Sequence, residues 1–158
     1  MTKQKLTVTL LAAAAMLVSS CDLLDCTQAD VSCLRIEIYD TYGVATTLPD
    51  TLTVMAYGTD SILVNRNLDT QELLLPLSYN AEADTFILHY YGKTFSWKDT
   101  LYVKKTNDLY FESPDCPTVM MHTLKEIAYT NRFINSARLV NNKVNFEEVT
   151  HMKLFVQE

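Results

Sequence analysis

Short runs of alternating polar and apolar residues, several of them opened by an Asp-Thr pair, dominate this chain. The pair opens such a run at Asp50-Thr51, Asp84-Thr85 and Asp99-Thr100. An Asp side chain stabilises a turn by accepting nearby backbone amides, whereas Thr and the β-branched or aromatic residues that follow suit a pleated strand. The intervals between the pairs are unequal, so they mark strand starts and not a repeated unit. The chain therefore favours strands over helices.

Alternation and turn residues together predict about ten short strands. They are expected at residues 33–39, 51–57, 60–66, 72–77, 85–91, 100–105, 109–113, 118–126, 135–141 and 151–156. A tight hairpin is expected at residues 57–60, and residues 80–84 are expected to connect the fourth and fifth strands. Strands spaced by roughly ten residues predict an all-β fold, an immunoglobulin-like antiparallel β-sandwich of about 8–10 strands, with a small closed β-barrel as the alternative.

The single tryptophan lies in the segment TFSWKDTLYV, residues 94–103. Phe95 and Trp97 occupy alternate positions, with Ser96 and Lys98 on the opposite face of the expected strand. This pattern predicts that Phe95 and Trp97 pack in the hydrophobic core. A turn is expected directly after Lys98, before the strand at 100–105.

The N-terminal residues follow the plan of a bacterial lipoprotein signal. Lys3 and Lys5 precede an apolar run that is shorter than the about 20 residues a membrane-spanning helix needs. Val18-Ser19-Ser20-Cys21 then matches a lipobox, in which the signal is cleaved before a cysteine whose thiol is lipidated. The alternative is an ordinary signal with Cys21 in a disulfide.

This interpretation divides the chain into three parts. We predict a signal peptide over 1–20, a lipidated N-terminus and short tether over 21–32, and a single β-rich domain over 33–158. Two or three acyl chains, palmitate among them, hold a protein on a bilayer for practical purposes permanently. We expect the outer membrane of a bacterial envelope, with the domain facing the periplasm and cell-surface exposure as the alternative.

The charge of the chain argues against two classes of partner. The formal net charge is −6, and it becomes more negative when Lys3 and Lys5 leave with the signal. Nucleic acids and anionic lipid headgroups attract Lys and Arg, so neither is an expected partner. The membrane contact is expected through the acyl chains on Cys21 alone.

Three cysteines remain after Cys21, and an exported chain meets an oxidising compartment, where disulfides form. Cys26 lies in a polar leader and Cys116 in a turn-like SPDCP stretch, whereas Cys33 lies on an expected strand. We predict a disulfide between Cys26 and Cys116, with Cys33–Cys116 as the alternative. A zinc site of these cysteines with His122 is disfavoured, because neither a short C-x-x-C pair nor a matching His spacing is present.

The sequence resembles an uncharacterised family of small Bacteroidota envelope lipoproteins that carries only a domain-of-unknown-function label. The resemblance rests on the lipobox with Asp25-Cys26 and on the segments DTLTVMAYGTDSILVNR, LPLSYN, DTLYV, FESPDC followed by His122, VNF and MKLFV. Pro117 departs from the family pattern, where Gly is expected after the cysteine. The resemblance implies an envelope lipoprotein with a β-rich body and no assigned activity.

No catalytic or cofactor motif is evident. The chain lacks a G-x-S-x-G elbow, an H-E-x-x-H pair and a glycine-rich phosphate loop, so we expect a protein that is not an enzyme and has no cofactor. Cys33 or Cys116 with His122 could make a thiol nucleophile and base, but a strand histidine is more often hydrogen-bonded structure and the thiols are more often oxidised. For Ca²⁺, Asn80, Glu82 and Asp84 are the candidate ligands, without the loop length and Gly of an EF-hand. No metal site is predicted.

An aromatic cluster is the candidate binding surface. Tyr90, Tyr91 and Tyr102 are the ligand-binding candidates, in a region that extends to Trp97. Adjacent Tyr90 and Tyr91 must point to opposite faces of a strand. We therefore expect a lipid-anchored, non-catalytic interaction or structural module that binds another envelope protein. A glycan-binding accessory lipoprotein that uses the exposed aromatics near Tyr90 and Trp97 is the alternative.

Overall fold

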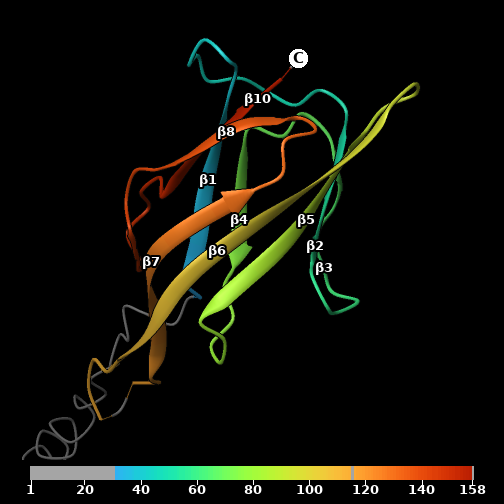
Figure 1. The fold of residues 1–158 in the computed structure, drawn as a ribbon. Helices are drawn as coiled ribbons and strands as arrows, with labels where there is room; N and C mark the ends of the chain where they lie inside the picture. Colours follow the sequence, from blue (N-terminus) through green and yellow to red (C-terminus); the bar gives the residue numbers. More distant parts are fainter. Residues whose placement is uncertain (1–30, 115, 158) are drawn as a thin grey trace, which may run out of the picture.

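Two β-sheets stacked face to face form the domain in a computed structural model, which describes residues 31–114 and 116–157 (Figure 1). The described residues contain these strands and no helix: β1 Cys33–Tyr39, β2 Thr51–Ala56, β3 Ile62–Asn67, β4 Glu72–Pro76, β5 Ala83–Tyr91, β6 Ser96–Tyr110, β7 Val119–Tyr129, β8 Ile134–Leu139, β9 Lys143–Val144 and β10 Met152–Val156. The all-β, two-sheet prediction is confirmed, and the closed-barrel alternative is not. The predicted signal and tether up to residue 30 lie outside the described residues.

The smaller sheet has the strand order β4-β1-β10-β8. β1 and β10 run parallel, with Ile36 opposite Met152, while β4 and β8 pair antiparallel on the two sides. The expectation of a purely antiparallel sandwich is therefore wrong for this sheet. A parallel pair needs a long connection between its strands, and here nearly the whole domain supplies it. The immunoglobulin-like assignment stays a prediction.

The larger sheet has the order β3-β2-β5-β6-β7-β9, with every pair antiparallel. The predicted hairpin between β2 and β3 forms, and Gly58 takes a φ of 78° in its turn. Residues 77–82 connect β4 with β5, as predicted, but these strands belong to different sheets. This connection therefore crosses the sandwich and is not a hairpin loop.

One strand is much longer than the sequence pattern predicts. The two strands expected at 100–105 and 109–113 are a single strand, β6. The polar residues Thr106, Asn107 and Asp108 resemble a turn in sequence, but each lies opposite a residue of β7. A bulge between Lys104 and Lys105 absorbs the change in register. The turn expected after Lys98 is also absent, because β6 begins at Ser96 and continues through it.

The core lies between the sheets and follows the alternation of the strands. In β1 every second residue, Leu34, Ile36 and Ile38, is buried. Leu101 and Val103 of β6 and Leu52 and Val54 of β2 face them from the larger sheet. Across residues 31–157, residue 115 aside, no helix is long and apolar enough to cross a membrane.

Candidate functional site

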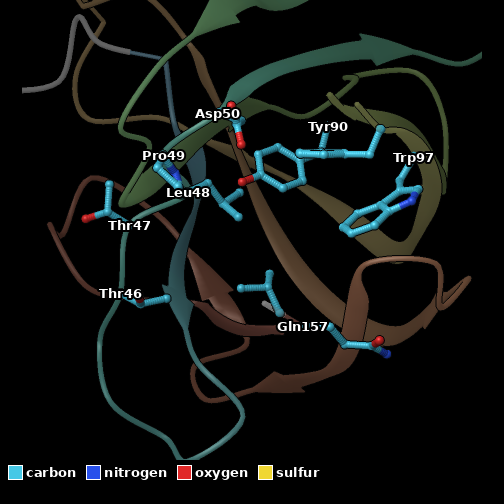
Figure 2. A pocket seen from close by; sticks show the side chains of 10 residues that line it. Thr46, Thr47, Leu48, Pro49, Asp50, Tyr90, Trp97 and Gln157 are labelled. Carbon is cyan, nitrogen blue, oxygen red and sulfur yellow. The ribbon is translucent and has the colours of Figure 1, made fainter. Parts of the chain in front are cut away.

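A pocket of about 340 Å³ opens at one end of the sandwich (Figure 2). Three separate parts of the chain line it: residues 46–50 between β1 and β2, the hairpin between β5 and β6, and the end of β10 with Gln157. Cavities of roughly this size and larger are typical of small-ligand sites in proteins. Aromatic rings form one wall of this pocket and polar groups form its rim, a combination that suits a small ligand.

Tyr90, Phe95 and Trp97 form the aromatic wall. The Phe95 and Trp97 ring centroids lie 4.5 Å apart, and the Tyr90 centroid lies 5.1 Å from Phe95 and 6.3 Å from Trp97. Phe133, which is fully buried, contacts the Tyr90 ring from the core side at 5.4 Å. Tilted pairs at such distances contribute about 0.5–1.5 kcal/mol each beyond area burial. The wall is therefore a rigid part of the fold.

The prediction that Trp97 packs on the core face is confirmed in part. Phe95 and Trp97 pack against the core cluster, but both remain only partly buried and their outer edges line the pocket. They lie near the end of the β5–β6 hairpin, where less of the domain covers the inner face. Trp97 thus has two environments, core on one side and cavity on the other.

Glycine is required at position 92 for this wall to form. A Cβ added to Gly92 would lie 2.6 Å from Phe95 Cε1 and 3.0 Å from the carboxyl carbon of Asp50. The Gly92 amide donates to the Phe95 carbonyl at 3.1 Å and so closes the turn. Gly92 therefore lets the Phe95 ring and the Asp50 carboxylate approach each other at the pocket rim.

The rim is polar. In Figure 2 the Tyr90 hydroxyl points toward Asp50 and Leu48, and Gln157 lies on the opposite side. Burial raises the pKa of Tyr90 and the Asp50 carboxylate acts in the same direction, while a hydrogen bond from the Asp50 backbone opposes them. The side chains of Asp50, Thr46 and Gln157 make no hydrogen bond to another described residue, so their polar atoms are available to a ligand.

Of the three tyrosines predicted to bind a ligand, only Tyr90 lines the pocket. Tyr91 lies on the outer face of β5 against the His89 ring, with centroids 4.6 Å apart. Tyr102 is 37% exposed on the outer face of β6. Neighbouring residues of a strand alternate between its faces, so the three do not form one surface. The sequence interpretation missed Asp50, Thr46 and Gln157, because no local pattern links residues that distant strands bring together.

A buried polar cluster lies elsewhere, around Lys105. The Lys105 ammonium donates to the carbonyls of Ser78 and Ala81 at 2.5 and 2.7 Å and to Asn107 Oδ1 at 2.7 Å, and it lies 3.4 Å from Asp84 Oδ2. Burial lowers the pKa of Lys105, while Asp84 opposes this shift. The amine holds the connection between the two sheets in place, so we assign it a structural role.

His122 belongs to the same cluster and is 1% exposed. Its Nδ1 lies 2.8 Å from Asn107 Oδ1, an oxygen that already accepts from Lys105, so Nδ1 must carry the proton. Nε2 is buried and has no hydrogen-bond partner among the described residues. Burial, and next the Lys105 charge, lower the pKa of His122 to about 4.

The stability of the domain is expected to fall in mild acid because of His122. Its folded pKa of about 4 lies below the about 6.5 of an unfolded chain, so only the unfolded state binds the proton between these values. The contribution is complete above about pH 6.5 and decreases to its lowest value near pH 4, a loss of about 3 kcal/mol. Urea unfolding at a series of pH values measures it.

His122→Gln is the matched variant, because its amide can still donate to Asn107 but does not titrate in this range. The unfolding free energy of the wild type minus that of the variant should fall by about 3 kcal/mol as the pH is lowered from 7 to 4, because only the wild type loses the His122 contribution. Burial also lowers the pKa of His151, which accepts the Arg35 amide at Nδ1 and adds a slope that both proteins share. A free-energy difference that stays constant over this pH range would contradict the lowered pKa of His122.

The other predicted combinations do not assemble. Asp84 is used by Lys105 and by the Ser78 amide, and no group of three His, Cys, Asp or Glu side chains in the described part of the chain could hold a metal. Among the described residues, His122 Nδ1 is hydrogen-bonded to Asn107 and Nε2 has no partner, so neither nitrogen is paired with Cys33 or Cys116. Cys33 is a free thiol whose pKa is raised by burial, which makes it less reactive. The predicted Cys26–Cys116 bond and Cys21 lipidation involve residues outside the described part and stay predictions.

The fold and the pocket together define an all-β, two-sheet protein with an aromatic-walled cavity of ligand size at one end. The chain belongs to a family of unknown function, DUF6452. The family model matches residues 51–156, about two thirds of this chain. The family match includes the whole aromatic wall and confirms the expectation of an uncharacterised domain. No curated protein and no solved structure matches the chain.

Proposed function

We propose that this protein is a lipid-anchored, non-catalytic binding module of the bacterial envelope and that the aromatic pocket is its recognition site. The lipobox at Val18–Cys21 supports the anchor, and the cavity supports the binding role. The main support for the proposal is that the pocket lies at the end of the domain opposite the point where the tether joins it.

The pocket and the tether lie at opposite ends of β1. Ser32 precedes the first residue of β1, whereas the Thr46 amide donates to the carbonyl of Ile38 near its last residue. β10 runs parallel to β1 and ends at Val156, which lines the pocket. A strand of seven residues spans about 20 Å, so the pocket lies about 20 Å from the point where the tether joins the domain, at the opposite end of β1.

Another envelope protein is the first proposed partner. A half-buried aromatic wall beside a small cavity suits the insertion of one apolar side chain, and such anchors supply much of the energy of protein interfaces. The polar rim then fixes the orientation of the inserted segment. With its acyl chains in the outer membrane, the protein is expected to present this end of the sandwich to a partner in the periplasm.

In-cell photo-crosslinking tests this role. A photoreactive residue at Gln157, on the pocket rim, should give a discrete protein adduct that disappears when Trp97→Ala removes part of the wall. The same residue at Tyr102, on the outer face of β6, is the matched control and should give none. Equal adducts from both positions, or none from the rim, would contradict recognition through the pocket.

Glycan binding is the second candidate, because the pocket combines an aromatic wall with a hydroxyl, an amide and a carboxylate. The single tryptophan reports on it directly. Native emission should be only partly accessible to iodide, and a bound neutral oligosaccharide should shift the emission and reduce quenching. If the Asp50 carboxylate binds sugar hydroxyls, Asp50→Ala should lower the oligosaccharide affinity measured from the emission shift at least tenfold. Saturating sugar without any change in emission rejects this candidate.

Loss of the lipidated thiol should detach the protein from membranes. Cys21→Ala removes the acceptor of the diacylglyceryl group, so we expect the precursor to stay uncleaved and the two or three acyl chains to be missing. Membrane fractionation with immunodetection of the mature and precursor sizes measures both effects. Cys33→Ala is the control, because this thiol lies within β1. A Cys21→Ala protein that is cleaved normally and remains in the membrane fraction would rule out the anchor.

A further inference from the structure

The hairpin of β6 and β7 continues beyond the sandwich. Its strands stay paired as far as Tyr110 opposite Val119, while the last buried residues of the hairpin are Lys105 and His122 (Figure 1). We call residues 109–114 and 116–120 the hairpin apex. In Figure 1 the apex reaches past the lower ends of β1 and β4, at the end of the domain away from the C-terminus.

Two large apolar side chains are exposed on the apex. Leu109 is 74% and Phe111 is 60% exposed, and Val31 beside the start of β1 is 53% exposed. Leu109 lies two positions beyond Asn107 on the face of β6 that carries buried Lys105. This face is therefore the inner, apolar face of the sheet, continued past the region that the domain covers. Exposed apolar side chains grouped in this way mark contact surfaces.

The tether enters the domain at the same place. The Ser32 hydroxyl donates to the Met120 carbonyl at 2.7 Å, and Ser32 is buried. Ten residue steps separate Cys21 from Val31, so the lipidated residue can lie at most roughly 35 Å from this point. If the predicted Cys26–Cys116 bond forms, it attaches the tether to the apex itself and shortens this reach to roughly half.

We propose that the hairpin apex rests on the bilayer, with Leu109 and Phe111 in the interfacial layer. The proposal rests on the lipid anchor of the proposed function, which brings this end of the domain to the membrane. The exposed apolar side chains then contact lipid, and this contact orients the domain so that the pocket points away from the bilayer. The anchored domain is then held at two points, the acyl chains and the apex.

The charges around the apex select the kind of lipid. Four carboxylates lie on or beside the apex, those of Asp108, Glu112, Glu147 and Glu148, the last two brought there by the Tyr110–Phe146 ring contact. The Lys143 ammonium lies beside Asp108, across the Thr123 hydroxyl that both contact, and offsets one of these charges. Anionic headgroups attract Lys and Arg and repel carboxylates. The apex therefore suits a zwitterionic surface such as phosphatidylethanolamine. Anionic lipids should weaken its contact.

A transplanted tryptophan tests the proposal. In a Trp97→Phe background, Phe111→Trp places the only tryptophan on the apex, and Tyr42→Trp places it in an exposed loop at the pocket end. Each lipidated protein is reconstituted in phosphatidylethanolamine–phosphatidylcholine vesicles containing brominated lipid. We expect a blue shift and strong quenching for Phe111→Trp and neither for Tyr42→Trp. Adding Leu109→Glu should abolish the quenching while the protein still floats with the vesicles.

A second vesicle preparation tests contact between the apex and the bilayer without depending on lipidation of Cys21. The mature chain from Asp22, with an N-terminal His-tag in place of Cys21, is held on the same vesicles by nickel-chelating lipid. Quenching of Phe111→Trp in this preparation supports apex contact even if native Cys21 proves unmodified. Phe111→Trp emission that stays unshifted and unquenched on both vesicle preparations overturns the proposal, as does quenching that increases with anionic lipid content.

Discussion

Replacing Asp99 by alanine is expected to lower the free energy of unfolding by about 4 kcal/mol or more, a larger loss than we expect from any other single substitution. Asp99 is 1% exposed, in β6, and accepts hydrogen bonds from the Thr130 hydroxyl and from the amides of Arg132, Phe133 and Ile134 at 2.6–3.0 Å. These donors form the connection by which the chain leaves β7 in one sheet and enters β8 in the other.

The size of the effect follows from the burial of the donors. Leaving a buried donor without an acceptor costs about 1–3 kcal/mol, and Phe133 and Ile134 are fully buried. Alanine would also leave the volume of the carboxylate empty. Water entering the site would recover part of the loss, which is why the expected value is below the sum over all donors.

Two variants make the measurement specific. Asp99→Asn keeps the shape and one acceptor oxygen, so its loss should be clearly smaller. Thr130→Val leaves the three amides bonded to Asp99 but removes the hydroxyl that donates to Asp99 and accepts the Thr100 amide at 2.8 Å, so about 1–2 kcal/mol is expected. Urea unfolding monitored by far-ultraviolet circular dichroism gives all three values. A change below 1 kcal/mol for Asp99→Ala would show that the connection between the sheets does not depend on this carboxylate.

Removal of the predicted Cys26–Cys116 disulfide should have the second largest effect. The bond would close a loop of about 90 residues, for which chain-entropy arguments give an upper value of about 4–5 kcal/mol. Cys116→Ser should lose most of this stability, and a reducing agent should then have no further effect on the variant. Cys33 carries a free thiol, so Cys33→Ser is the control and should leave the reductant response intact.

Non-reducing peptide mapping identifies the bonded pair directly. A peptide joining Cys26 with Cys116 is expected in the mature protein. Recovery of a Cys33–Cys116 peptide, or of all three thiols in alkylated form, would show that the assignment is wrong.

The strands were predictable from the sequence where one face of each strand is buried and the other is solvated. β1 and β10 show this alternation clearly, and the expected bounds agree within one residue. β6 was divided wrongly because Thr106 to Asp108 have turn-forming side chains, yet pairing with β7 outweighs this local preference. Asp99 likewise resembles a solvated turn residue in sequence, and only the β7–β8 connection shows why it is buried.

The pocket was predictable only in its aromatic part. Phe95 and Trp97 share a strand face, so period-two alternation places them together with Tyr90 of the paired strand. Asp50, Thr46 and Gln157 reach the same rim through the stacking of two sheets and the parallel pairing of β1 with β10. That pairing joins residues more than a hundred positions apart, and no local pattern in one sequence specifies it.

The central claim is that a lipid on Cys21 holds this domain at the membrane with its pocket facing away. Mass spectrometry of the intact protein, extracted with detergent from bacterial membranes, tests it most directly. We predict a chain that begins at Cys21 and carries the added mass of a diacylglyceryl group, with or without a further N-acyl chain. A chain that begins at Met1, or one with an unmodified Cys21, would contradict it.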